Sequence, residues 1–387
     1  MKIVCSTNMP FVEEAFRTLG NPIVLEGRNL TPADVQDAEL MAIRSTTRVD
    51  AALLENSRVR FVGTATIGTD HMDIPYLEQR GIHWCFAPGC NANSVSEYVT
   101  AALLCVAEHH GLTLVGKTLG VIGVGNVGKR VVSKGLALGM KVLRNDPPRE
   151  RAGDAAPGES FVPLDRLLAE SDFITLHVPL TRDGQDATYH LAGARFFERM
   201  KPGTVYLNCA RGAVTDTNAL LHAMDRNIVS HTTIDTWEGE PDFRIDLLTR
   251  VDLGSPHIAG HSFEGKAYGT LMVYESACRH LGVAPSWKLE PHLPPPPVPE
   301  YRLNASGKTD QQALREAVKA VYDIEADDAR FRAIASLPTD QRKRQFDKLR
   351  SNYPMRREFR FTRIHLTGAS KSLDQSLRAL GFQRHNT

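Results

Sequence analysis

The stretch TLGVIGVGNVGKRVVSKGLALGMKVLRND, residues 118–146, decides the fold. It begins with an apolar run over residues 119–124, which predicts a buried strand, and continues as a helical pattern to residue 138. A second apolar run, residues 140–143, predicts another strand and ends close to Asp146. Strand, helix and strand within about 30 residues form one unit of a parallel α/β sheet.

The turn between the first strand and the helix contains the pattern Gly-x-Gly-x-x-Gly. Gly123 permits a tight turn, Gly125 lets the backbone approach a pyrophosphate, and Gly128 lets helix and strand pack closely. The helix N-terminus adds unpaired N–H groups and the positive end of its dipole. The pattern therefore predicts a dinucleotide site rather than a structural turn. The contacts expected at this turn are Gly123, Gly125, Asn126, Val127 and Gly128.

The acid at the end of the second strand bears on which dinucleotide binds. Asp146 can accept hydrogen bonds from a ribose diol and would repel a 2′-phosphate, which favours NAD over NADP. Two nearby arginines, Arg144 and Arg149, leave the alternative open, because an arginine can seat that phosphate.

The bulk properties are those of an ordinary globular protein. The chain has 387 residues, 42% of them hydrophobic and 24% charged, so two or three domains are expected. Net charge is +1, but residues 300–387 carry 18 Lys and Arg against 11 Asp and Glu. A surface facing solvent or another subunit explains this basic end more simply than nucleic acid does, because its charges alternate with apolar positions.

The cysteines and the apolar runs bear on the cellular location of the protein. None of the six cysteines forms a CxxC pair, a pattern that fits reduced thiols rather than disulfides or a metal site. The N-terminal stretch has too short an apolar core for a signal peptide, and no apolar run approaches 18 residues. We therefore expect a cytoplasmic protein without a membrane span or a bound metal.

Three domains are expected, of which the first two are α/β. Strands alternate with helices both before and after residue 92, and the helical pattern of residues 262–280 is expected to pack back on the first domain. Two crossing helices would then make a hinge, with a cleft between two Rossmann-like or flavodoxin-like parallel-sheet domains. The expected boundaries are 1–92 with 262–284 for the substrate domain, 93–261 for the NAD-binding domain, 285–299 for a Pro-rich linker and 300–387 for a small α+β domain.

The C-terminal domain shows helical and strand patterns but no catalytic cluster. Thr309 and Gln312 resemble a capping box, and Phe359 and Phe361 alternate with arginines as in a strand. Its small size predicts a role in oligomerisation or docking.

Hydroxyl and charged side chains follow several predicted strands. In the first domain, Ser45 and Thr66 lie in polar clusters that suit a phosphate or carboxylate, although capping of the next helix is an equal alternative. In the second domain Arg211, Glu240 and His257 each come shortly after a strand. Hydride transfer from an alcohol needs a base such as His, a carboxylate that orients the base, and an Arg that holds a substrate acid.

This ordered set resembles the D-isomer-specific 2-hydroxyacid dehydrogenase family. Other stretches are similar to one branch of that family, which acts on a small phosphorylated 2-hydroxy acid. They cover residues 61–66, 87–91, 121–128, 146–149, 237–241, 257–260, 264–266, 350–353 and 356–358.

The resemblance implies NAD-dependent oxidation at the substrate's 2-hydroxyl and a homodimer formed through the C-terminal domain. It assigns His257 as base, Glu240 as its partner and Arg211 as the group that grips the carboxylate. It also implies substrate contacts at Ser45, Thr66 and His261. At the position of His261 the family commonly has Tyr. The implied cofactor contacts are Asp146, Val178 (often Thr in the family), Cys209, Ala210, Asp235 and Gly260.

Two alternative functions follow from the same residues. One is a dehydrogenase for a different D-2-hydroxy acid. The other is an NAD-sensing regulator that binds nucleic acid through its basic end, against which the intact catalytic set argues.

Overall fold

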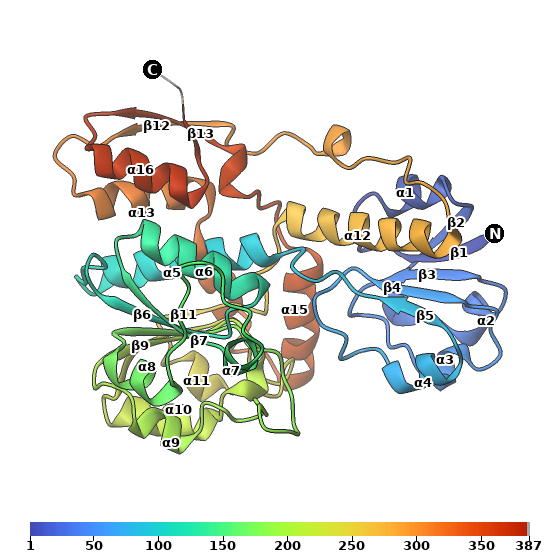
Figure 1. Ribbon diagram of the computed structural model, residues 1–387, viewed down its shortest axis with the longest axis horizontal. Coiled ribbons are helices and arrows are strands. Elements are labelled where there is room, and N and C mark those ends of the chain that lie inside the picture. Colours follow the sequence, from blue (N-terminus) through green and yellow to red (C-terminus); the bar gives the residue numbers. More distant parts are fainter. Residues whose placement is uncertain (385–387) are drawn as a thin grey trace. The chain divides into compact units, whose positions relative to one another are not determined.

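The computed structural model of the protein describes residues 1–384. Two compact units are distinguished by their internal contacts (Figure 1). The first consists of residues 1–92 and 262–295, and the second of residues 93–261 and the chain from Pro296 onwards. The C-terminal region thus belongs to the same unit as the dinucleotide motif.

The first unit is built on a five-stranded parallel sheet, as the strand–helix alternation predicts. Helices α1 and α12 pack on one face, and α2, α3 and α4 cover the other. A Cβ at Gly63 of β4 would lie 2.4 Å from a methyl carbon of Val273, so α12 approaches the sheet closely and forms the expected return leg. The elements are β1 (Lys2–Ser6), α1 (Val12–Arg17), β2 (Asn21–Leu25), α2 (Pro32–Val35), β3 (Leu40–Ile43), α3 (Ala51–Leu54), β4 (Phe61–Thr64), α4 (Ile74–Gln79), β5 (His83–Cys85) and α12 (Phe263–Leu281).

The second unit contains a six-stranded parallel sheet in the order β11-β10-β9-β8-β6-β7. The chain adds β7 on one side of β6 and all later strands on the other, which places the switch point of the sheet between β6 and β8. Its strands are β6 (Thr118–Ile122), β7 (Lys141–Asn145), β8 (Phe173–Leu176), β9 (Thr204–Asn208), β10 (Val229–Ile234) and β11 (Leu253–Gly254). Its helices are α5 (Ala92–His109), α6 (Asn126–Ala137), α7 (Pro147–Arg151), α8 (Leu164–Glu170), α9 (Ala194–Glu198), α10 (Thr217–Asp225) and α11 (Ile245–Leu248).

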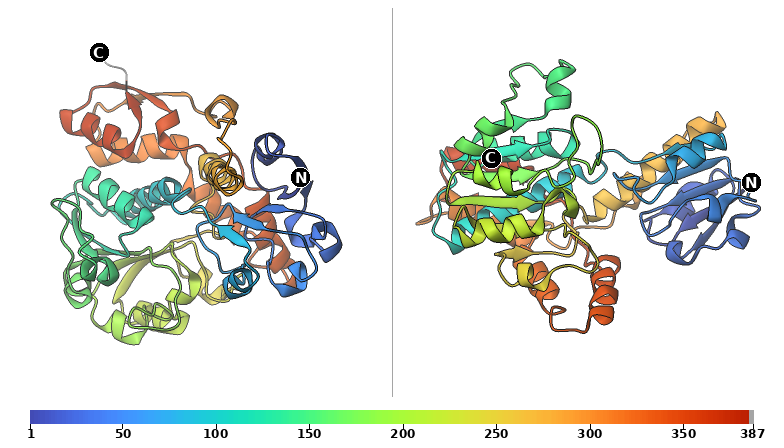
Figure 2. Two further views of the ribbon diagram at one scale, coloured as in Figure 1. Left: turned by 45° about the vertical axis from the view of Figure 1, so that its right-hand side comes forward. Right: turned by 90° about the horizontal axis from the view of Figure 1, so that it is seen from below.

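The C-terminal region adds a small parallel sheet, β12-β13-β14, to this unit. Helices α13 and α16 cover it and lie beside α5 and α6 in Figure 1 and in the left view of Figure 2. Apolar residues of α13 and α16, such as Leu314 and Leu377, share one buried core with Val99 of α5 and Val131 of α6. The elements are β12 (Glu300–Asn304), α13 (Asp310–Val321), α14 (Ile324–Arg332), α15 (Thr339–Ser351), β13 (Arg363–Thr367), α16 (Lys371–Leu380) and β14 (Gln383–Arg384).

One local prediction is wrong. Residues Phe359–Phe361 form a 3-10 turn, not a strand, and the strand β13 begins at Arg363. Phe359 is fully buried and stacks on Phe382, with ring centroids 4.7 Å apart. The alternation of phenylalanine with arginine therefore does not distinguish a strand from a tight turn, because a turn can also point one aromatic side chain into the core.

The termini of several helices follow the local sequence. Thr309 forms the expected capping box with Gln312 at the start of α13, and Ser262 caps α12, which ends at Gly282 with φ of 69°. Among residues 1–384, none of the helices is long and apolar enough to cross a lipid bilayer. The six cysteines are free thiols.

Candidate active site

The glycine-rich turn between β6 and α6 has the shape that a dinucleotide requires. Gly123 adopts φ of 84°, and a Cβ there would lie 2.8 Å from a methyl carbon of Val178, which lies just beyond β8. A Cβ at Gly128 would lie 2.0 Å from the carbonyl oxygen of Gly123, so only glycine lets α6 pack this closely. A Cβ at Gly125 would instead meet no atom within 4 Å, which leaves room for a pyrophosphate at the N-terminus of α6.

Asp146 follows β7 and is held beside this turn. Its carboxylate accepts hydrogen bonds from the backbone N–H of Val124, at 2.8 Å, and of Arg149, at 3.2 Å. Arg149 is itself engaged in ion pairs with Glu159 and Asp154, each at 3.0 Å. Hydrogen bonds to those two acids raise the pKa of Arg149. Arg149, one of the two arginines that could seat a 2′-phosphate, is thus already neutralised by Glu159 and Asp154, which fits NAD.

The other expected cofactor positions lie at the same edge of the sheet. Val178, Cys209 with Ala210, and Asp235 come within two residues of the ends of β8, β9 and β10, and Gly260 follows the short β11. The carboxyl ends of parallel strands meet at one edge, so these positions surround the switch point between β6 and β8.

The loop that carries Arg211 is organised by the side chain of Asn208. That side chain donates to the backbone oxygen of Arg211, at 3.1 Å, and to the hydroxyl of Thr215, at 3.0 Å, and it accepts from the N–H of Ala210 at 3.0 Å. A Cβ at Gly212 would lie 2.0 Å from the carbonyl oxygen of Trp237. The Arg211 loop therefore rests directly on the backbone of the loop that carries Glu240.

Glu240 and His257 are hydrogen-bonded to each other between Oε1 and Nδ1. The second carboxylate oxygen of Glu240 accepts from the N–H of Trp237 at 3.0 Å, which fixes the carboxylate. Burial acts to raise the pKa of Glu240, but the charge of His257 and its hydrogen bond outweigh burial and lower that pKa. The histidine side chain remains 28% exposed. Its Nδ1 is thus occupied by Glu240, which leaves Nε2 as the nitrogen available for a substrate.

The loop around His257 is held by Asp235, which is almost fully buried. The Asp235 carboxylate accepts from the hydroxyl of Ser255 at 2.6 Å and from the N–H groups of Ile258 and Ala259 at 2.7 and 3.1 Å. Burial raises the pKa of Asp235, an effect that the neighbouring His257 partly offsets. His257 itself adopts φ of 55°, an uncommon backbone conformation for a residue other than glycine. This backbone conformation is maintained by the surrounding hydrogen bonds.

In the first unit, Ser45 and Thr66 follow the paired strands β3 and β4. The helices that come after them are capped by Asp50 and Asp73. Helix capping, the alternative explanation for these two hydroxyls, is therefore not their role. Ser45 is exposed, and Thr66 donates to the carbonyl oxygen of Gly68 at 2.9 Å.

The C-terminal region contacts the loop that carries His257 and His261, and the sequence patterns do not predict this contact. The ring of Tyr353 lies edge-on to that of His261, with centroids 5.9 Å apart. Arg356 donates to the carbonyl oxygens of Ala259, at 3.2 Å, and Ser94, at 2.6 Å. The only sequence signal is that residues 350–353 and 356–358 are among the stretches that resemble the family.

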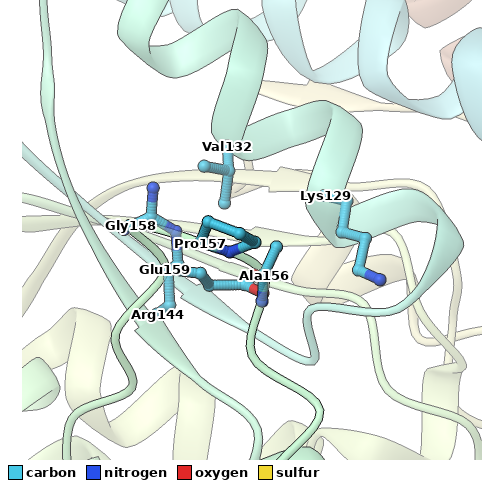
Figure 3. A pocket seen from close by; sticks show the side chains of 7 residues that line it. All are labelled: Lys129, Val132, Arg144, Ala156, Pro157, Gly158 and Glu159. Atoms are coloured by element: carbon cyan, nitrogen blue, oxygen red, sulfur yellow. The ribbon is translucent and has the colours of Figure 1, made fainter.

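A surface pocket elsewhere in this unit contains none of these residues. It lies beside α6 and β7, where Lys129, Val132 and Arg144 face residues 156–159 (Figure 3). Glu159 of this pocket is the ion-pair partner of Arg149, so the pocket adjoins the Asp146 network rather than the His257 loop.

Comparison with known proteins agrees with this geometry. Residues 98–259 match the family described as D-isomer specific 2-hydroxyacid dehydrogenase, NAD binding domain, and residues 292–381 match a domain of unknown function, DUF3410. The chain is 43% identical to erythronate-4-phosphate dehydrogenase of Escherichia coli O157:H7 over 93% of its length and 92% of the relative's. It is 44% identical to the Azotobacter vinelandii protein of that name, over 99% of this chain and 100% of the relative.

A solved structure extends the comparison to a protein with a bound cofactor. D-lactate dehydrogenase from Aquifex aeolicus, complexed with NAD and lactic acid, is 28% identical and superposes with a TM-score of 0.59. The superposition covers 72% of this chain and 95% of that one. The chain therefore belongs to the erythronate-4-phosphate dehydrogenases, within the NAD-dependent D-isomer-specific 2-hydroxyacid dehydrogenase family.

Proposed function

We propose that the protein oxidises the 2-hydroxyl of erythronate 4-phosphate to a 2-oxo acid, with NAD, as a step in pyridoxal 5′-phosphate biosynthesis. The observation that carries the reaction is the Glu240–His257 pair at the carboxyl edge of the NAD-binding sheet, next to the Arg211 loop. The assignment of this substrate rests on the names of relatives that are 43–44% identical over nearly the whole chain.

Each of the three residues has a distinct task in this proposal. His257 accepts the hydroxyl proton at Nε2, because its Nδ1 is held by Glu240. Glu240 fixes the ring and stabilises the imidazolium that forms. Arg211 holds the substrate carboxylate with its planar guanidinium. When bound, NAD supplies the acceptor for the hydride that leaves carbon 2.

The remaining contacts complete the proposal. Ser45, Thr66 and His261 would bind the substrate. The cofactor would be held by Gly123, Gly125, Asn126, Val127, Gly128, Asp146, Val178, Cys209, Ala210, Asp235 and Gly260. The turn geometry at Gly123 and Gly128 and the placement of Asp146 support the cofactor set.

The proposal also assigns a role to each domain. Residues 1–92 and 262–284 would bind substrate, 93–261 would bind NAD, 285–299 would link, and 300–387 would form a homodimer interface. The unit made by residues 1–92 and 262–295 supports the first boundary. A cytoplasmic location belongs to the same proposal, supported by six free thiols. Light scattering of the purified protein should give twice the chain mass.

Steady-state kinetics with NAD and a panel of 2-hydroxy acids tests the reaction. Erythronate 4-phosphate should give the highest kcat/KM, and faster turnover of lactate or glycerate would refute the substrate assignment. The regulator alternative predicts salt-dependent DNA binding without turnover. The hydrogen bond between Glu240 and His257 favours the enzyme over the regulator, because it orients a base for catalysis.

A further inference from the structure

Helix α15 of the C-terminal region lies along the loop that follows Glu240. Near the start of the helix, Arg342 approaches Asp242 at 3.7 Å. One turn later, Phe346 packs on Phe243, with ring centroids 5.8 Å apart. Residues at i, i+4 and i+8 share one face of a helix, so Arg350 continues this face by one further turn.

The guanidinium of Arg350 carries no hydrogen bond or ion pair within residues 1–384, and its Nε atom is buried. Its guanidinium carbon lies 5.9 Å from the ring centroid of Phe346, and its charge helps to lower the pKa of Glu240. Both carboxylate oxygens of Glu240 are already engaged, by His257 and by the N–H of Trp237. A half-buried cation with no anion bonded to it is costly, and an anionic ligand would remove that cost.

The chain beyond Arg350 continues to the second catalytic loop. Tyr353 is anchored by its hydroxyl, which donates to Asp327 at 2.7 Å, and its ring meets that of His261. The segment 350–356 therefore extends from the Glu240 loop to the loop that carries His257. An anion bound at Arg350 would lie at the margin of the proposed reaction centre.

We propose that Arg350 binds the terminal phosphate of the substrate, so that the C-terminal region contributes to substrate recognition. This inference rests on the proposed function. There, His257 takes the hydroxyl proton and Arg211 the carboxylate, and the phosphate is the one anionic group of the substrate not yet given a cation in the second unit. A guanidinium can bind two phosphate oxygens at once, which suits this group better than a point charge does.

The test compares Arg350→Gln and Arg350→Lys with the wild type on erythronate 4-phosphate and on erythronate. With Arg350→Gln, KM for the phosphorylated acid should rise about 10- to 100-fold, since a hydrogen bond to a charged group is lost, while KM for erythronate stays unchanged. Inhibition by inorganic phosphate should weaken by a similar factor. The KM of Arg350→Lys for the phosphorylated acid should lie between those of the wild type and Arg350→Gln, because lysine keeps the charge but cannot bind two phosphate oxygens with a planar group.

Arg344→Gln is the matched control, because Arg344 is an exposed residue of the same helix. It should match the wild type in both KM values, and equal melting temperatures would show that all variants are folded. Equal increases in both KM values would overturn the inference and assign Arg350 to the carboxylate. A lower kcat with a shifted pH profile and an unchanged KM ratio would overturn it too, and would make Arg350 a positioning residue for Glu240. A wild-type enzyme that does not prefer the phosphorylated acid would refute the proposed function instead, and phosphate inhibition would still test Arg350 as an anion site.

Discussion

Gly212 and Trp237 are in backbone contact: a Cβ added to Gly212 would lie 2.0 Å from the carbonyl oxygen of Trp237. The contact joins the Arg211 loop to the Glu240 loop, which follow the neighbouring strands β9 and β10. The relative position of Arg211, which is proposed to bind the carboxylate, and of Glu240, which orients the proposed base, is therefore set by a glycine that neither binds nor reacts.

Gly212→Ala should reduce kcat/KM and lower stability together. The added methyl group must push the two loops apart, and overpacking of this kind costs about 1–3 kcal/mol. Urea unfolding and steady-state kinetics would measure the two effects. Gly193→Ala is a suitable control, because its Cβ would meet only the carbonyl oxygen of His190, at 3.2 Å. A Gly212→Ala enzyme with wild-type kinetics would show that the loops do not need this contact.

His257→Ala should reduce kcat/KM by about 10²–10⁴, the usual contribution of a general base. In Glu240→Gln, kcat should also fall, because the ring of His257 loses the carboxylate that holds its Nδ1. The exposed His222 provides a control, since His222→Ala should leave the rate unchanged. A loss of less than tenfold in His257→Ala would exclude this histidine as the base.

Asp146→Ser should raise KM for NAD about 10- to 100-fold, since the hydrogen bonds of a charged group to the ribose are lost. Use of NADP should stay poor, because Arg149 remains paired with Asp154 and Glu159. The ratio of kcat/KM for the two cofactors measures both statements. Asp165→Ser, at an exposed acid of α8, is the control. Efficient use of NADP by the Asp146 variant would show that the Arg149 ion pairs are easily broken.

His177 should make the fold sensitive to acid. Burial lowers the pKa of His177 to about 3, so the folded protein resists protonation while the unfolded chain takes up a proton below about pH 6.5. Stability is then lost as pH falls from about 6.5 towards 3. This residue alone would account for roughly 2 kcal/mol between about pH 7 and pH 5.

Urea unfolding of wild type and His177→Gln at several pH values isolates this contribution. The variant should show the flatter dependence on pH, and His222→Gln should follow the wild type. Parallel curves for wild type and His177→Gln would mean that His177 is protonated in the folded protein.

Much of the fold follows from local patterns. The order strand, Gly123 to Gly128, helix, strand and Asp146 is found as predicted, because each part depends only on its neighbours. Arg211, Glu240 and His257 could be picked out because the ends of parallel strands meet at one edge, a rule that needs no coordinates.

Other features depend on contacts between distant parts of the chain. No local pattern indicates that Gly212 rests on Trp237, that Asp235 holds the His257 loop, or that α15 follows the loop after Glu240. The error at Phe359 has the same origin, because its partner Phe382 lies on a later segment.

The core shared by α5, α6, α13 and α16 has a consequence for synthesis on the ribosome. Val99 and Val131 are made long before Leu314 and Leu377, the residues that bury them. During translation the nascent NAD-binding segment therefore presents an uncovered apolar face until the last helix emerges. Chaperones that recognise exposed apolar surface should engage the chain in that interval, and a ribosome stalled before residue 371 should hold a protease-sensitive intermediate.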